Sequence, residues 1–232
     1  MKKIGILVAM QSEYDLVKTL FDNPEACRMG EWSFLSGTIA GVEVVLGKSG
    51  IGKVSAAVGT VEMIRRYAPD ALLSTGVAGG IALGLRVMDV VIGKEMVYHD
   101  VWCGEGNAYG QVQGLPPRFE ADPRLLQCAL SLAEEERRFI AGLICTGDQF
   151  ITDHQSLSRI KEHFPEGVAV DMESCAIAQV CHTYKVPFLS YRLISDTPGV
   201  EAHARQYRNF WEEAPRHSFE LLRQLIATFN LS

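Results

Sequence analysis

One stretch, residues 168–196, constrains the fold more than any other part of the chain. It opens with a short apolar run, Val168–Val170, that is typical of a buried strand. The apolar side chains within Ser174–Tyr184 are spaced for one buried face of a helix, and Phe188–Ile194 is a second apolar strand. A strand, a helix and a strand in this order predict a right-handed parallel crossover.

Both predicted strands stop just before an acidic residue. Glu173 closely follows the first strand, and Asp196 closely follows the second. Ligands bind at the carboxyl ends of the strands in parallel sheets. The sequence therefore predicts that Glu173 and Asp196 meet at one edge of the sheet, where a hydrolase or a transferase would use them.

The rest of the chain continues the alternation of strands and helices. Further strands are predicted at 3–9, 32–39, 42–47, 71–75, 87–97 and 139–145, and helices at 11–21, 53–67, 122–137, 153–163 and 206–229, the last interrupted by Pro215. Residues 98–119 are rich in glycine and proline and predict a long functional loop. We therefore expect one α/β domain over residues 1–232, with a mixed, largely parallel central sheet flanked by helices.

Charge and hydropathy exclude several classes of partner. The formal net charge of −6 argues against a nucleic acid or an anionic membrane surface as the main partner. No apolar run approaches the ~18 to 20 residues of a membrane span. The apolar run 4–9 is too short for a signal peptide, so we expect a cytoplasmic protein.

The cysteines and histidines do not predict a metal site. The six cysteines contain no C-x-x-C pair, which favours reduced thiols packed as small apolar residues. The six histidines show no H-E-x-x-H or similar spacing. We expect no metal and no cofactor.

Two glycine-rich stretches, 48–53 and 76–80, are candidates for ligand contact. Glycines let backbone N–H groups approach a ligand closely. Neither stretch has the spacing of a Walker motif, and 76–80 fits a dinucleotide-binding fingerprint only loosely. Tight turns explain both stretches at least as well as ligand binding does.

Three further residues have both a structural and a functional interpretation. Glu13 lies in the first turn of a predicted helix, which favours an acid that compensates the helix dipole. Phe150 and Ile151 are apolar residues in a predicted loop. They are explained either by core packing or by the wall of a pocket for an aromatic ligand.

Taken together, these pieces resemble the 5′-methylthioadenosine/S-adenosylhomocysteine nucleosidases, within the nucleoside phosphorylase superfamily. The matching stretches run in family order over nearly the whole chain. They are Ile4-Gly5-Ile6, Ala9-Met10, Glu13, Lys48-Ser49-Gly50-Ile51-Gly52-Lys53, Thr75-Gly76-Val77-Ala78-Gly79-Gly80, Tyr98-His99-Asp100, Tyr109-Gly110-Gln111, Gly147-Asp148-Gln149-Phe150-Ile151, Val170-Asp171-Met172-Glu173 and Ile194-Ser195-Asp196.

The resemblance implies a role for each of three acids. Asp196 would be the general acid that protonates N7 of adenine, and Glu13 would position and deprotonate the attacking water. Glu173 would bind the ribose hydroxyls. The remaining substrate-binding residues implied by the resemblance are Met172 at the sugar, Phe150 and Ile151 at the adenine, Met10, Ile51, Tyr207 and Phe210 at the 5′-alkylthio group, and Val77, Ala78, Gly79 and Ser195.

The resemblance also implies the reaction and the assembly. The reaction would be hydrolysis of the N-glycosidic bond of 5′-methylthioadenosine and S-adenosylhomocysteine, and also of 5′-deoxyadenosine, releasing adenine. A homodimer is expected, in which Tyr109 completes the 5′-alkylthio slot of the neighbouring subunit. The aromatic residues of loop 98–119 favour such burial.

Three alternatives remain open. A purine nucleoside phosphorylase of the same superfamily would need arginines for phosphate, and 9–12 and 73–77 contain no Arg or Lys, which favours hydrolysis. A hydrolase of aminofutalosine or futalosine stays open because the segment 102–105 is unlike the family. A non-catalytic nucleoside-binding module would not need Glu13 and Asp196 together.

Overall fold

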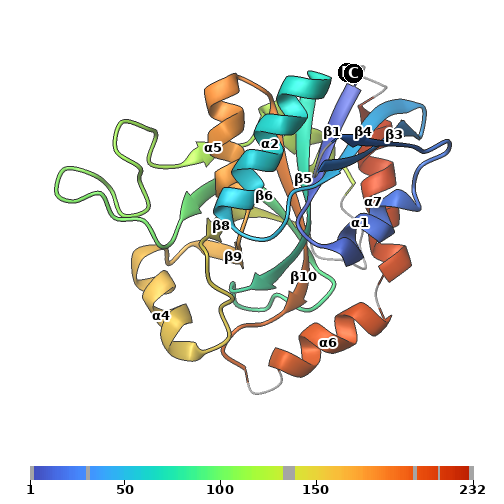
Figure 1. The fold of residues 1–232 in the computed structure, drawn as a ribbon. Coiled ribbons are helices and arrows are strands. Elements are labelled where there is room, and N and C mark those ends of the chain that lie inside the picture. The colour runs from blue at the N-terminus through green and yellow to red at the C-terminus, as the bar shows by residue number, and fades with distance from the viewer. Residues whose placement is uncertain (1–2, 30–31, 133–138, 201–202, 214, 230–232) are drawn as a thin grey trace.

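The structure, a computed structural model, describes residues 3–29, 32–132, 139–200, 203–213 and 215–229 (Figure 1). The strands are β1 (Lys3–Val8), β2 (Glu25–Met29), β3 (Trp32–Ile39), β4 (Val42–Lys48), β5 (Ala71–Gly80), β6 (Val90–Tyr98), β7 (Phe119–Glu120), β8 (Phe139–Thr146), β9 (Gly167–Asp171) and β10 (Phe188–Asp196). The helices are α1 (Gln11–Lys18), α2 (Lys53–Tyr67), α3 (Pro123–Leu130), α4 (His154–His163), α5 (Ser174–Tyr184), α6 (His203–Glu213) and α7 (Pro215–Thr228).

These strands form one mixed sheet. Their order is β10-β6-β8-β9-β5-β1-β4-β3-β2, and β7 pairs with β6. Because β10 also pairs with β5, the strands β10, β6, β8, β9 and β5 close into a ring, and β1, β4, β3 and β2 extend from it. Strand β1 pairs parallel with β4 and β5, β5 pairs parallel with β10, and β8 pairs parallel with β9. Strand β3 pairs antiparallel with both β2 and β4. The predicted α/β class with a mixed sheet and flanking helices is confirmed.

The predicted parallel crossover from β9 to β10 is wrong. Strand β5 lies between them, and it pairs antiparallel with β9 but parallel with β10. Two apolar strands joined by a helix indicate that both faces of each strand are buried. They do not show which strands pair with each other in the sheet. The two strand ends nevertheless meet, because Gly79 of β5 is in register with both Val170 and Asp196.

Several boundaries also differ from the predictions. Strand β5 continues to Gly80, so the glycine-rich stretch 76–80 is part of a strand instead of a loop. The predicted final helix consists of two helices, α6 and α7, and β2 was not predicted. The helix predicted at 122–137 ends at Leu130, and residues 133–137 lie outside the described part of the chain.

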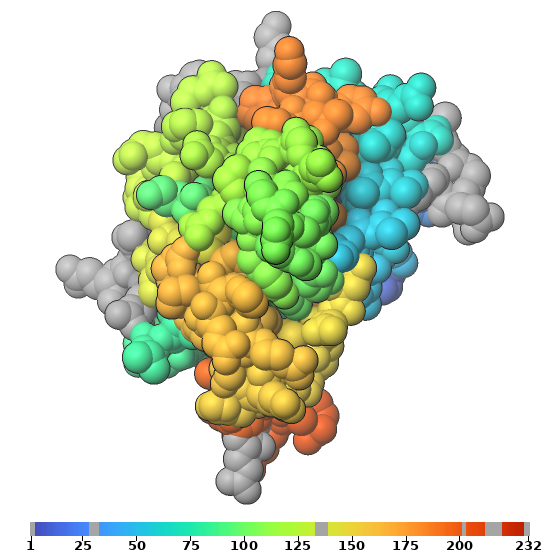
Figure 2. Space-filling model, turned by 90° about the vertical axis from the view of Figure 1, so that its left-hand side faces the viewer, coloured from blue at the N-terminus to red at the C-terminus, as the bar shows by residue number. Residues whose placement is uncertain are grey.

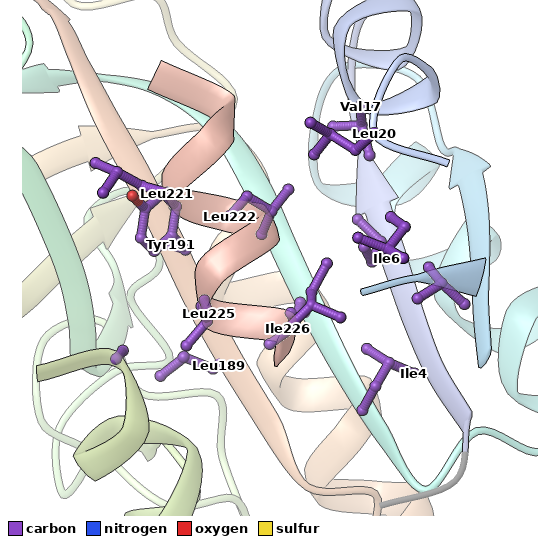
Figure 3. Close-up of a cluster of buried hydrophobic side chains, with 14 of the residues drawn as sticks. Ile4, Ile6, Val17, Leu20, Leu189, Tyr191, Leu221, Leu222, Leu225 and Ile226 are labelled. Carbon is purple, nitrogen blue, oxygen red and sulfur yellow. The ribbon is translucent and has the colours of Figure 1, made fainter. Parts of the chain in front are cut away.

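Helices cover both faces of the sheet and enclose two large apolar clusters. One cluster packs α1, α3, α6 and α7 against the sheet, and the other packs α2 and α5 against it. Figure 3 shows Leu221 and Leu225 of α7 beside Tyr191 and Leu189 of β10, and Leu222 and Ile226 on the side of α7 toward Ile4 and Ile6 of β1. Among the described residues, no helix is long and apolar enough to cross a membrane.

Candidate active site

A cavity of about 350 Å³ opens where the ends of β5, β9 and β10 meet. Helix α1, the turn before α2, the segment that precedes α4 and helix α6 complete its wall. Ala9, Met10, Glu13, Ile51, Val77, Ala78, Gly79, Gln149, Phe150, Ile151, Val170, Asp171, Met172, Glu173, Ser195, Asp196 and Tyr207 line the cavity.

Glu13 enters this cavity from the first turn of α1. Its Oε2 accepts hydrogen bonds from the backbone N–H groups of Ala9 and Met10, each at 2.9 Å, and its Oε1 accepts one from Val77 at 3.1 Å. The carboxylate thus satisfies N–H groups at the start of its own helix, which is the structural role expected from the sequence. Burial nevertheless raises its pKa, although these hydrogen bonds and the charge of Arg192 act in the opposite direction.

Gly76 makes room for the Glu13 carboxylate. A Cβ atom at position 76 would lie 2.4 Å from Oε1 of Glu13, far inside van der Waals contact. Glycine is therefore required in β5 by the close approach of an acid from another element.

Glu173 follows β9 and is buried at the N-terminus of α5. Its Oε1 accepts a hydrogen bond from the backbone N–H of Gly52 at 2.9 Å, which links it to the turn before α2. Burial, and next the negative charge of Asp171, raise the pKa of Glu173 to about 7. The carboxyl group therefore exchanges a proton near neutral pH.

Asp196 ends β10 and is almost fully buried. Ser195 Oγ donates to its Oδ1 at 2.5 Å, and the Nε2 atom of His203 lies 2.7 Å from its Oδ2. Burial raises the pKa of Asp196, while Ser195 and His203 act to lower it. A carboxyl group in this setting holds a proton to a higher pH than an exposed aspartic acid does.

A buried ion pair lies behind the two glutamates. Arg192 Nε donates to Asp171 Oδ2 at 2.9 Å, and Arg192 Nη2 donates to Ser74 Oγ at 2.7 Å and to Ser174 Oγ at 3.0 Å. Thr146 Oγ1 also donates to Asp171, at 2.6 Å. The ion pair thus links β5, β8, β9, β10 and the start of α5. The positive charge of Arg192 favours the ionised forms of Glu13 and Glu173.

An apolar and aromatic wall faces the acids. The Phe150 ring lies 5.4 Å from the Tyr207 ring in an edge-to-face arrangement, and 5.5 Å from the imidazole of His203. Tyr207 Oη donates to Met10 Sδ at 3.7 Å. The cavity therefore joins a polar side to a side suited to a flat, apolar group.

Thirteen of the fifteen residues expected at the site line this cavity. The two that do not are Phe210 and Tyr109. Phe210 packs into the apolar cluster beneath α6 and α7. Tyr109 stacks on His163 with a centroid distance of 3.5 Å and lies outside this cavity.

Sequence reasoning missed three polar residues of the site region, namely Arg192, His203 and, as a cavity-lining residue, Asp171. Arg192 had a usable signal, because a cation inside an apolar strand needs a buried partner. His203 had none, because its contact with Asp196 depends on how α6 folds back over β10. Within the described residues, no group of three or more His, Cys, Asp or Glu side chains is arranged to hold a metal ion.

Comparisons with known proteins agree with this geometry. The model of the phosphorylase superfamily matches residues 3–227. A 5′-methylthioadenosine/S-adenosylhomocysteine nucleosidase from Anoxybacillus flavithermus is 43% identical over 98% of this chain and 99% of its own length.

Solved structures show the same likeness. The nucleosidase of that name from Neisseria meningitidis, in complex with methylthio-immucillin-A, has a TM-score of 0.93 and 38% identity, and the match covers 98% of this chain and 100% of the other. A futalosine hydrolase from Helicobacter pylori has a TM-score of 0.90 but only 28% identity, over 98% of each chain.

Proposed function

The chain belongs to the 5′-methylthioadenosine/S-adenosylhomocysteine nucleosidases of the phosphorylase superfamily, and we propose a mechanism by which its cavity hydrolyses these nucleosides. It is an N-glycosidic hydrolase that releases adenine and the 5′-substituted ribose. The observation that carries the mechanism is the placement of Glu13, Glu173 and Asp196 around one cavity with an aromatic wall.

Asp196 acts as the general acid in this proposal. Adenine lies against Phe150 and Ile151, and Asp196 donates a proton to N7 while the bond between C1′ and N9 breaks. The burial that raises the pKa of Asp196 supports this role, because the acid must still hold its proton near neutral pH.

Glu173 and Glu13 act on the ribose and on water. The Glu173 carboxylate accepts hydrogen bonds from the ribose hydroxyls, which strengthen as positive charge develops on the sugar. Glu13 takes a proton from the water that attacks C1′. The three backbone N–H groups that hold Glu13 fix the direction in which its carboxylate presents a base. Met172 packs against the sugar.

Water is favoured over phosphate as the nucleophile because the nearby cations are already engaged. Arg192 is bound to Asp171, Ser74 and Ser174. Lys53 Nζ lies 2.7 Å from Asp100 Oδ2. Phosphate binding needs free cationic donors around the anion.

The 5′-alkylthio group is proposed to lie among Met10, Ile51 and Tyr207, which form the apolar end of the cavity. This slot also accepts the smaller 5′-deoxyadenosine. The higher identity to nucleosidases than to the futalosine hydrolase supports methylthioadenosine and adenosylhomocysteine as substrates over futalosine.

We further propose a homodimer, formed by one nucleosidase domain that spans residues 1–232 in each subunit. Val54 and Val58, one turn apart on α2, are 75% and 47% exposed, and Trp102 is 57% exposed. Figure 2 shows the loop 98–119, in green, standing out between α2, α4 and α5. An isologous contact over this face would cover these side chains and bring Tyr109 toward the neighbouring slot.

A cytoplasmic location is proposed on the state of the cysteines. All six are free thiols in the structure. Thiols persist in the reducing cytosol and pair in oxidising compartments.

One assay tests the proposed reaction. Adenine release from methylthioadenosine is measured by absorbance, with and without added phosphate. We expect equal rates and a reducing sugar as the second product. A rate that depends on phosphate, with a sugar phosphate as product, would point to a phosphorylase.

A further inference from the structure

His203, the first residue of α6, lies against the proposed general acid. Its Nε2 is 2.7 Å from Asp196 Oδ2, and both side chains are more than nine-tenths buried. The N–H direction of the ring is poorly aligned, because Nε2 makes no hydrogen bond of acceptable geometry. The contact therefore brings an imidazole nitrogen and a carboxylate oxygen within proton-transfer distance in a buried setting.

Two neighbours hold the imidazole and the carboxylate in this arrangement. The Phe150 ring packs 5.5 Å from the His203 ring and also lines the cavity. Ser195 Oγ donates to Oδ1 of Asp196, so His203 and Ser195 occupy different oxygens of the same carboxylate. Asp196 thus separates His203 from the cavity, and His203 can act on a ligand only through Asp196.

We propose that His203 and Asp196 share one proton, and that this proton passes from His203 through Asp196 to N7 of adenine. The inference rests on the proposed function, because it takes Asp196 as the general acid. His203 is a positioning and proton-supplying residue in this scheme, since it does not touch the substrate.

The proton balance of the step is complete. The shared proton moves from His203 Nε2 to Asp196 and on to N7, as the electron pair of the C1′–N9 bond passes to the purine. This leaves an ionised Asp196 beside a neutral imidazole. Water adds at C1′ and gives its proton to Glu13. Glu13 later releases that proton to solvent and His203 takes one up, so each turnover consumes one water and returns the protein unchanged.

The pair has a consequence for pH dependence. The shared proton can reside on either Asp196 or His203. The pair therefore keeps it up to a pH at least as high as Asp196 would keep a proton beside a neighbour that cannot ionise. His203 therefore extends general acid catalysis to higher pH. Replacing it by a neutral side chain moves the basic limb of the pH–rate profile to lower pH.

The other titratable groups near the pair belong to the site already described. Tyr207 lies one turn along α6, and burial raises its pKa first, with the charges of Glu13, Asp196 and Glu173 adding to the rise. Arg192 lies behind the glutamates, where its charge is already bound to Asp171.

Two substrates distinguish proton supply from packing. Methylthioadenosine needs a protonated leaving group, whereas a nitrophenyl 5-methylthioriboside releases nitrophenolate, an anion that leaves without a proton. We compare the wild-type protein with His203→Gln and His203→Asn between pH 5 and 9. His154→Gln is the control, because His154 is an exposed histidine of α4 whose ring contacts Ser158.

We expect both His203 variants to lose ~10- to 100-fold in kcat for methylthioadenosine at pH 8, within the usual worth of general acid catalysis. The basic limb should shift to lower pH, while turnover of the nitrophenyl substrate stays near that of the wild type. If kcat falls equally on both substrates, His203 acts only by packing and the proposal fails. If the basic limb of the pH–rate profile does not shift, the proposal fails as well. Turnover of the nitrophenyl substrate also reports whether each variant is folded.

Asp196→Asn separates this inference from the function on which it rests. That variant should lose ~2 to 4 orders of magnitude in adenine release and keep the nitrophenyl reaction. If it releases adenine at the wild-type rate, the general acid assignment fails. If Asp196→Asn loses adenine release but the His203 variants turn over methylthioadenosine as the wild type does, Asp196 remains the general acid. The proposed proton sharing with His203 is then wrong.

Discussion

Glu13 combines two roles that the sequence presents as alternatives. It accepts hydrogen bonds from backbone N–H groups at the start of α1, and the same carboxylate faces the cavity. The interactions that stabilise the helix start also orient the proposed base. A substitution at this position therefore affects stability and catalysis together.

Glu13→Gln should lower turnover by ~2 to 4 orders of magnitude, because the amide cannot accept the proton of water. The amide NH2 group also has to replace one oxygen, which leaves a backbone N–H group unpaired at a cost of about 1 to 3 kcal/mol. Steady-state kinetics and thermal unfolding measure the two effects separately. A lower unfolding temperature with unchanged turnover would leave Glu13 as a helix cap alone.

Glu173 makes the empty protein less stable as the pH rises. Its pKa is raised from 4.5 to about 7, so between these values the folded chain holds a proton that the unfolded chain has lost. The free energy of unfolding therefore falls across this window by about 3 kcal/mol and stays lower above it.

Glu173→Gln should remove this loss, because glutamine does not ionise and still accepts the hydrogen bond from Gly52. We expect the free energy of unfolding to rise by about 2 to 3 kcal/mol at pH 8 and by little at pH 4.5. Denaturant titrations at both pH values check this. Glu166→Gln is the control, because a backbone hydrogen bond, and next the ion pair with Arg118, lower the pKa of Glu166. No gain at pH 8 would contradict the assigned cause.

At the scale of elements, the cavity depends on a link between α2 and the segment that carries Phe150. Asp148 Oδ1 accepts the backbone N–H of Lys53 at 2.7 Å, and Asp100 Oδ2 accepts the backbone N–H of Asp148 at 2.9 Å. Asp100 also binds the Lys53 ammonium group. These charge-assisted bonds fix the aromatic wall relative to the acids.

Asp100→Asn weakens this link without touching the cavity. We expect the KM for methylthioadenosine to rise by ~5- to 30-fold, equivalent to about 1 to 2 kcal/mol of lost ordering, with kcat nearly unchanged. The matched control is Glu62→Gln, which breaks an exposed ion pair with Arg66 within α2. A fall in kcat with a constant KM would show that the link serves the chemistry and not the binding of adenine.

At the scale of the whole molecule, the exposed valines of α2 test the proposed dimer. Burying a charge in an apolar contact costs several kcal/mol. The double change Val54→Glu and Val58→Glu should therefore give a monomer of 25.6 kDa in sedimentation velocity, with reduced activity. Leu83→Glu is the control, because Leu83 is fully exposed on the turn after β5. A wild-type monomer that keeps full specific activity on dilution would contradict the dimer.

The sequence by itself determined most of the elements and most of the residues that line the cavity. Helices α2 and α5 match their predicted bounds, because apolar spacing and stop signals are local properties of the chain. The resemblance placed Glu13, Glu173 and Asp196 together, and all three line the cavity.

Only the tertiary structure decided which elements became neighbours. Strand β5 separates β9 from β10, and α6 folds back so that His203 meets Asp196. Phe210 was expected in the slot, yet it packs in the core because its side of α6 faces the sheet. Apolar periodicity encodes burial, but pairing between distant segments depends on the free energy of the whole packed chain. The buried contacts of Arg192 and His203 arise at that level. A cation within an apolar strand indicates that Arg192 has a buried partner, but no local pattern shows that the partner is Asp171.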